Sequence, residues 1–550
     1  MQTTALLAGA CKLIYIVGKG RKMSEINNVT RLAKPKRKGL LSLVFSRFFI
    51  IVLLILVELL VVLLPLFVLE GLFSHFIAFL GIFTFIMLVY LFNSKMDSTA
   101  KLTWMFIIAL FQVAGALMLL FTQTNAGHRL VCERTAKMIG DTKTMIPQDP
   151  EVLQKLREED SYTDDLVRYL NRSGCFPAFA QTETTYFPSG EAKFEVMLEE
   201  LAKAEQYIFM EYFIIEEGYM WGKILEILLA KAKAGVDVRI MYDGMCEIST
   251  LPSNYCKLLK AEGIRAKAFA PIKPLLSSHY NYRDHRKICV IDGKVAFNGG
   301  VNLADEYINE IERFGHWKDT AVMLKGDAVR SFTLMFLQMW NVNVDVKTAD
   351  FTEVYKEVET DNAAEIHPSG YVIPFCDCPL DEDKVGEAVY MDILNRAGRY
   401  VHIMTPYLIL DGELETALKY AGQRGIDVKL ILPGIPDKKL AYSLAKSHYL
   451  QLLRAGVKIY EYTPGFVHAK VWTSDDEKGV VGTINLDYRS LYHHFECATY
   501  MYRTDCISDI ERDFQDTLVK CRPVTEETIR GTEKFYKIVG PLAKLIAPLL

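Results

Sequence analysis

Two segments of this chain carry histidine, lysine, aspartate and asparagine in the same order and spacing. The first reads HRKICVIDGKVAFNGGVNLADEY and the second reads HAKVWTSDDEKGVVGTINLDYRS. A single copy would be explained equally well by a solvated His and Lys at a strand edge, whereas two complete copies are hard to attribute to chance. The matched residues are His285, Lys287, Asp292 and Asn302 in the first segment, and His468, Lys470, Asp475 and Asn485 in the second.

The spacing of these residues suits the binding of an anion. Residues i and i+2 of a strand face the same side, so His285 and Lys287 can point at one ligand, as can His468 and Lys470. In the first copy an Asp-Gly pair then signals a turn, and the returning strand brings the Asn alongside. Two such halves, paired about a pseudo-twofold axis, would form one site with two imidazoles, two ammonium groups and two carboxamides. Such a site binds a phosphate and contains its own acid–base pair.

The elements that must position these residues follow an α/β pattern that occurs twice. Strand-like and helix-like segments alternate before the first motif, which favours an α/β sheet. The order then recurs, because AGRYVHIMTPYLIL resembles AEQYIFMEYFII and RGIDVKLILP resembles AGVDVRIMYD. We therefore predict a duplicated α/β unit. In its first copy the expected strands are 207–215, 236–242 and 264–270, and the expected helices are 222–234 and 255–262.

The paired motifs resemble the signature of the phospholipase D superfamily, over roughly residues 180–520. The resemblance implies two mixed sheets flanked by helices, and a two-step transfer through a covalent phosphohistidine, with no metal and no cofactor. It also implies that His285 is the nucleophile and that His468 is the general acid and then the general base. An imidazole can take either role near neutral pH. Lys287 and Lys470 then supply positive charge, and Asn302 and Asn485 supply hydrogen-bond donors for the phosphate.

Four carboxylates belong to this expected site. An alignment of HWKDTAVML with HHFECATYM places Asp319 opposite Glu496, and the resemblance implies that these two orient the histidines. The alternative is that both are ordinary surface carboxylates of a strand. Asp292 and Asp475 complete the catalytic motifs, and we interpret them as structural residues that tie the two halves together.

Three apolar segments near the N-terminus predict a multi-pass protein of the cell membrane. They are long enough to cross a bilayer and show no polar face. The basic run before them favours a cytosolic N-terminus, but three crossings would then place the large domain outside, against the basic residues after the third segment. The membrane face therefore stays open. The expected spans are 48–69, 72–92 and 102–121.

The same patterns divide the chain into regions. The apolar tail, residues 538–550, is expected either to seat the enzyme on the bilayer or simply to pack on its domain. The expected regions are a basic segment (1–40), a transmembrane region (41–122), a linker segment (123–185), a first phospholipase D-like domain (186–350), a linker (351–370) and a second such domain (371–550).

The charge distribution bears on the kind of partner, and the cysteine content bears on the state of the thiols. Residues 1–122 hold 12 Lys and Arg against 4 Asp and Glu, whereas the whole chain has a net charge of −4. The remainder is therefore acidic, which disfavours a nucleic-acid partner. The 11 cysteines are scattered, without a usual zinc spacing, which predicts reduced, mostly buried thiols.

Within the superfamily, the segments FMEYFI, GGVNLADEY and GTINLDYRSLYHHFE resemble bacterial cardiolipin synthases. The chain departs from them in its additional apolar segment 48–69 and in His494, where that family commonly has Asn. The resemblance implies that one phosphatidylglycerol donates its phosphatidyl group to another, giving cardiolipin and glycerol. The alternatives are a hydrolase of the phospholipase D type, another phosphatidyltransferase, or an inactive membrane scaffold. The oligomeric state cannot be predicted from these features.

Overall fold

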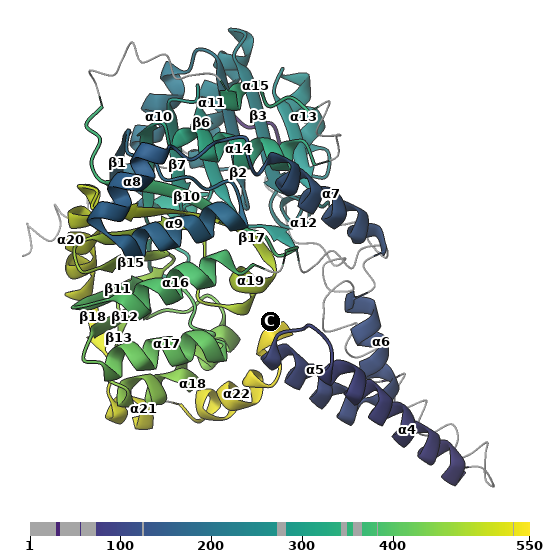
Figure 1. Ribbon diagram of the computed structural model, residues 1–550. Helices are drawn as coiled ribbons and strands as arrows, with labels where there is room; N and C mark the ends of the chain where they lie inside the picture. The colour runs from purple at the N-terminus through teal and green to yellow at the C-terminus, as the bar shows by residue number, and fades with distance from the viewer. Residues whose placement is uncertain are drawn as a thin grey trace, which may run out of the picture.

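The chain folds into two stacked α/β halves with a helical N-terminal extension (Figure 1). The computed structural model describes residues 29–33, 56, 73–123, 126–271, 282–342, 349–355, 366–381, 383–531 and 533–549. The predicted span 48–69, apart from Leu56, and most of the predicted basic segment lie outside these residues.

The first half is built on a seven-stranded mixed sheet. Its three strands at one edge run parallel, as in a βαβ unit, and the others pair antiparallel. The predicted strands at 207–215, 236–242 and 264–270 are confirmed. In spatial order the strands are β1 (Thr182–Phe187), β9 (Ala321–Gly326), β7 (Val295–Gly299), β6 (Lys287–Ile291), β2 (Tyr207–Tyr212), β3 (Asp237–Asp243) and β4 (Arg265–Phe269).

The second half repeats this order of strands, which confirms the predicted duplication. One short strand extends its far edge, and a two-residue strand of the first half, β5 (Arg283–Asp284), pairs with β17. The strands are β10 (Tyr371–Asp377), β17 (His494–Tyr502), β16 (Lys478–Gly482), β15 (Val471–Ser474), β11 (Tyr400–Met404), β12 (Asp427–Pro433), β13 (Lys458–Tyr462) and β18 (Cys521–Pro523).

Helices cover both sheets, and the two halves share one apolar core. That core joins Phe209 and Val290 of the first sheet to Val372 and Tyr500 of the second, all fully buried. Burial of such side chains is the main stabilising term in folding. The principal helices are α10 (Gly190–Lys203), α11 (Tyr219–Lys233), α13 (Tyr255–Ala261) and α14 (Val329–Trp340) in the first half, and α16 (Val385–Arg396), α17 (Gly412–Gln423), α18 (Lys439–Arg454) and α20 (Cys506–Leu518) in the second.

The segment before the first sheet is helical and belongs to the folded body. Its first helix packs against α14 and its third against α16, so it contacts both halves. The first sheet begins at Thr182, four residues before the expected boundary at 186. The nine cysteines whose side chains the structure describes are free, in agreement with the expected reduced thiols. The helices are α7 (Ala126–Thr142), α8 (Pro150–Glu159) and α9 (Ser161–Ser173).

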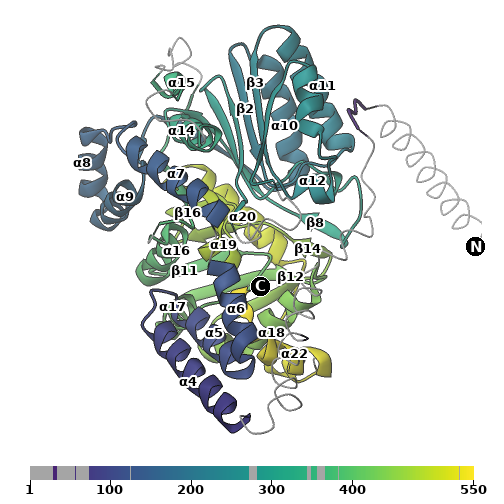
Figure 2. The same ribbon diagram turned by 90° about the vertical axis from the view of Figure 1, so that its right-hand side faces the viewer.

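The apolar N-terminal region projects from this body as three helices, α4 (Phe73–Phe92), α5 (Ser98–Leu110) and α6 (Gln112–Gln123) (Figure 1), which lie toward the viewer in Figure 2. Within the described residues, α4 alone is long and apolar enough to cross a membrane, and only 11% of its apolar window is buried. It matches the expected span 72–92.

The expectation of one span over 102–121 is wrong. The backbone leaves helical geometry at Phe111, with φ −126° and ψ 81°, and this break separates α5 from α6. Gly115 then packs close to α5, since a Cβ there would lie 3.0 Å from the Ile107 carbonyl oxygen. A continuous run of apolar residues does not reveal such a break, because both helices have the composition of a span.

Candidate active site

Both motif histidines lie where the two halves meet. The short strand β5 runs parallel to the start of β17, and the His285 N–H donates to the Phe495 carbonyl at 2.9 Å. The second half mirrors this arrangement, because β14 (Gly465–Val467) runs parallel to β8 (His316–Lys318). There the His468 N–H donates to the Lys318 carbonyl at 2.7 Å. Each histidine is therefore fixed by the backbone of the opposite half.

Each histidine ring also meets a carboxylate of the opposite half. His285 Nδ1 lies 2.9 Å from both carboxylate oxygens of Glu496, and His468 Nδ1 lies 2.7 Å from Asp319 Oδ2. Both carboxylates are fully buried. Glu496 and Asp319 thus occupy the positions that the alignment predicts, and they reach across between the halves. A carboxylate at Nδ1 fixes the ring and leaves Nε2 for chemistry.

The residue after the first motif glycine differs between the halves for a physical reason. A Cβ at Gly300 would lie 2.0 Å from Asp319 Oδ1, so only glycine leaves room for this carboxylate. The equivalent residue in the second half is Thr483, whose hydroxyl donates to Glu496 Oε2. Both solutions hold the carboxylate against its histidine.

The two lysines bring positive charge into a closed space. Lys287 and Lys470 are 1% exposed, and burial lowers the pKa of Lys287 to about 8 and that of Lys470 to about 7. Lys470 Nζ lies 2.9 Å from His468 Nδ1, and Lys287 Nζ donates to the His285 carbonyl. A bound phosphodiester would stabilise both ammonium groups through its negative charge.

The histidines are neutral before an anion binds. Burial, together with the nearby Lys470, lowers the pKa of His468 to about 4, although Asp319 opposes this shift. Burial also holds the pKa of His285 well below its ordinary value, and the charges of Lys287, Lys470 and His468 act in the same direction. The histidines thus influence each other across the two halves. One neutral imidazole suits nucleophilic attack, and an arriving phosphate favours protonation of the other.

The two motif aspartates lie at turns and bind backbone. Asp292, at φ 52°, accepts from the N–H groups of Glu205, Gln206 and Tyr207. Asp475, at φ 59°, does the same for residues 398–400. The expectation that these aspartates tie the two halves together is wrong, because each one joins a hairpin to the central strand of its own half. Three amide donors per carboxylate hold the hairpin that carries the histidine and lysine.

The two motif asparagines differ in their contacts. Asn302 Oδ1 accepts from the Ile214 N–H, and its amide nitrogen donates to the Tyr307 hydroxyl at 2.8 Å. One amide hydrogen remains for a phosphate. Asn485 Oδ1 is buried without a hydrogen-bond partner. A role of either amide in phosphate binding stays a prediction.

Comparisons with known proteins agree with this geometry. The family described as "Cardiolipin synthase, PLD-like domain" matches residues 197–340 and 390–518. A cardiolipin synthase of Alkalihalophilus pseudofirmus is 32% identical over 471 residues, which cover 84% of this chain and 91% of that protein. The chain belongs to the cardiolipin synthase family of phospholipase D-like proteins. The family resemblance seen in the motifs is thereby confirmed.

Two further proteins are similar to this chain, one in sequence and one in fold. An uncharacterized protein of Streptococcus mutans is 57% identical and aligns over 84% of this chain and 99% of its own length. The crystal structure of phosphatidylserine synthase from Haemophilus influenzae superposes with a TM-score of 0.53 at 15% identity, over 70% of this chain and 97% of that one. This likeness supports the fold alone. At the level of its family, the protein is a phosphatidyltransferase.

Aromatic and imidazole rings surround the two motif histidines, and of these the sequence analysis did not single out Phe213. Phe213 meets the His285 ring edge-on, and His494 lies beside it at 5.4 Å between ring centroids. Trp317 occupies the equivalent place beside His468, at 5.3 Å. In the sequence, Trp317 and His494 each stand two residues before Asp319 or Glu496. Their contacts with a histidine of the opposite half could not be predicted from that position.

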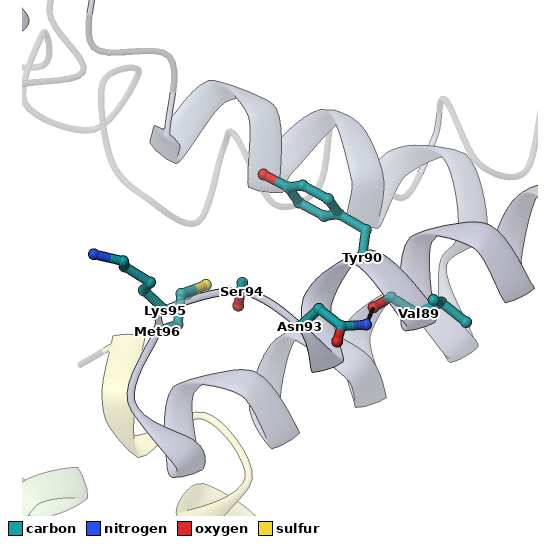
Figure 3. A pocket seen from close by; sticks show the side chains of 6 residues that line it. All are labelled: Val89, Tyr90, Asn93, Ser94, Lys95 and Met96. Carbon is teal, nitrogen blue, oxygen red and sulfur yellow. Dashed lines mark hydrogen bonds between the residues drawn. The ribbon is translucent and has the colours of Figure 1, made fainter.

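Two other features, one at the site and one beyond it, have the form of a binding place. His285, His494 and Glu496 offer three atoms within 4.8 Å that could hold a metal ion, although the neighbouring ammonium groups oppose a second cation there. A hollow of about 660 Å³ at the end of α4 contains none of the histidines (Figure 3). Its lining is Val89, Tyr90, Asn93, Ser94, Lys95 and Met96.

Proposed function

We propose that this protein synthesises cardiolipin by transferring the phosphatidyl group of one phosphatidylglycerol to another through a phosphohistidine. The observation that carries the proposal is the crossed pairing of His285 with Glu496 and of His468 with Asp319. This pairing engages Nδ1 of each ring, and Lys470 Nζ lies 3.0 Å from His468 Nε2. In the proposed reaction both Nε2 atoms act on one phosphorus, and Lys287 and Lys470 balance its charge. The rest of the reaction follows from these roles.

In the first step, Nε2 of neutral His285 attacks the phosphorus of phosphatidylglycerol. The P–N bond forms as the bond between phosphorus and the headgroup glycerol oxygen breaks. Protonated His468 gives its proton to the departing oxygen, so glycerol leaves as a neutral alcohol. His468 is then neutral and ready to act as a base.

In the second step, a free glycerol hydroxyl of another phosphatidylglycerol attacks the phosphohistidine. His468 takes the proton of this hydroxyl, the P–N bond breaks and His285 is regenerated. The product is cardiolipin, and no cofactor or metal takes part. Effective concentration favours this acceptor over water, because donor and acceptor share one membrane surface.

The apolar region supports a location at the cell membrane, with the protein embedded beside its phospholipid substrates. The helix α4 exposes Phe79, Ile82 and Phe85 along its length, which water disfavours and a lipid bilayer accepts. A multi-pass arrangement requires further spans in the residues before α4. The acidic remainder of the chain agrees with a lipid partner in place of a nucleic acid.

The test is the lipid composition of cells that make the protein. Mass spectrometry of cells that lack other cardiolipin synthases should show cardiolipin with the intact protein and none with His285→Ala at equal protein level. Cardiolipin at the same level in both strains would contradict the proposal.

A further inference from the structure

One buried imidazole beside the reacting histidines makes no hydrogen bond. His494 is 8% exposed, and neither its Nδ1 nor its Nε2 has a hydrogen-bond partner. A buried polar group without a hydrogen-bond partner destabilises the folded protein. A histidine in this position therefore calls for a partner that the folded chain does not itself supply.

The direction of the ring follows from its place on β17. His494 and Glu496 are two residues apart on one strand, so their side chains share a face. His494 Nδ1 lies 3.8 Å from Glu496 Oε1, and His285 Nδ1 lies 2.9 Å from the same oxygen. Both imidazoles therefore turn Nδ1 toward one carboxylate and carry Nε2 on the opposite edge of the ring. The two rings lie side by side, with 5.4 Å between their centroids.

The protonation of His494 sets what its Nε2 can bind. Burial lowers its pKa to about 4, with the nearby His285 acting in the same direction and Glu496 opposing it, so the ring is neutral near pH 7. The carboxylate favours the proton at Nδ1, which leaves a lone pair on Nε2. A lone pair repels a phosphoryl oxygen and accepts a hydrogen bond from a hydroxyl.

We propose that His494 Nε2 is a subsite for a hydroxyl of the neutral polyol headgroup that leaves or enters the phosphoryl group. This inference rests on the proposed function and names the feature of the substrate that the site recognises. Lys287 Nζ lies over the ring of Phe213, which also contacts His494, and its positive charge disfavours a cationic amino-alcohol headgroup. Glycerol offers hydroxyls beyond the one that reacts, and a simple alcohol or water does not.

The equivalent position in the other half is occupied by a tryptophan, so this imidazole subsite exists only beside His285. Trp317 stands two residues before Asp319 and beside His468, as His494 stands before Glu496 and beside His285. Its indole Nε1 is also buried without a partner, but an indole N–H only donates. An acceptor without a partner therefore lies beside His285, and a donor without a partner lies beside His468.

The test is a competition between two alcohols of similar size. The full-length protein in phosphatidylglycerol vesicles receives carbon-13-labelled glycerol and 1-propanol at equal concentration. Labelled phosphatidylglycerol and phosphatidylpropanol are then measured by mass spectrometry. The wild-type protein should prefer glycerol, and His494→Phe, which keeps a ring and loses both nitrogens, should reduce that preference about tenfold.

His494→Leu repeats the test with a smaller side chain in case the phenyl ring does not fit, and circular dichroism selects the folded variant. A purely structural role for His494 would lower both products together, and an unchanged product ratio in a folded variant would overturn the proposal. If the wild-type protein makes no transfer product from either alcohol, it is the proposed function that fails. These outcomes are distinct because the ratio is measured only where transfer occurs.

Discussion

The charges of the individual residues in this site balance one another. Two buried ammonium groups, of Lys287 and Lys470, stand against two buried carboxylates, of Asp319 and Glu496. With both imidazoles neutral, these four groups have no net charge. One proton on a histidine can therefore balance the charge of a phosphodiester anion that binds there. In the proposed mechanism, substrate binding thereby supplies the acid for the first step.

The two histidines should be separately indispensable. His285→Ala removes the nucleophile and His468→Ala removes the proton carrier, so each should lower transfer by at least about 10³-fold. Sedimentation with membranes and circular dichroism should match those of the wild type. The assay measures cardiolipin formed from phosphatidylglycerol vesicles. Near wild-type output from either variant would refute a site with two essential histidines.

Acid should destabilise the free protein through the buried imidazoles. The pKa of His468 is about 4 in the folded protein and 6.5 ordinarily, so between these values the unfolded chain binds more protons. Its contribution to stability is full above pH 6.5 and falls as the pH drops toward 4, by about 3 kcal/mol in total. Unfolding temperatures between pH 7 and pH 5 should therefore fall less steeply for His468→Gln.

The matched control for this pH dependence is His367→Gln, since the side chain of His367 is exposed. That variant should follow the wild type. If His468→Gln loses stability in acid as steeply as His367→Gln does, the neutral buried state of His468 is not the cause.

At the scale of helices and strands, the C-terminal helix joins the catalytic body to the apolar extension. One face of α22 (Lys534–Lys544) packs on α18, where a Cβ at Gly540 would lie 2.5 Å from the Ser443 carbonyl oxygen. The residues after it contact α5. Its other face exposes Ile538 and Leu542. The helix therefore has both a packing face and a free apolar face beside the extension (Figure 2).

The free face of α22 should bind lipid. Ile538→Ser with Leu542→Ser removes apolar surface without touching the face on α18, and should weaken association with phosphatidylglycerol vesicles by about tenfold or more. Flotation of vesicles measures this. Val519→Ser, at an 87% exposed position after α20, is the matched control. Equal flotation of all three proteins would mean that α22 only packs on its domain.

The sequence predicts the elements better than it predicts their contacts. The strands of both halves followed from the alternation of apolar segments, and the role of Asp292 as a turn residue followed from Asp-Gly. The crossed pairing could not be predicted, because Asp319 and His468 are far apart in the chain and only the backbone contact of β8 with β14 brings them together. The break at Phe111 could not be predicted either, because the residues on both sides of it are equally apolar.

For the whole molecule, positive charge from lysines should make a metal ion unnecessary. Transfer by the purified protein should continue in excess chelator, because Lys287 and Lys470 already stabilise the phosphate. The measurement is the rate of cardiolipin formation before and after dialysis against the chelator. Complete loss of activity that a divalent ion restores would instead favour a metal at His285, His494 and Glu496.

We propose that the enzyme passes the phosphatidyl group to a lipid hydroxyl rather than to water. The direct measurement is the product balance of the purified protein with vesicles of phosphatidylglycerol. We expect equal amounts of cardiolipin and free glycerol, phosphatidic acid as a minor product, and less cardiolipin when glycerol is added, because glycerol attacks the same intermediate. Phosphatidic acid as the main product, with cardiolipin unaffected by glycerol, would refute the synthase and identify a hydrolase.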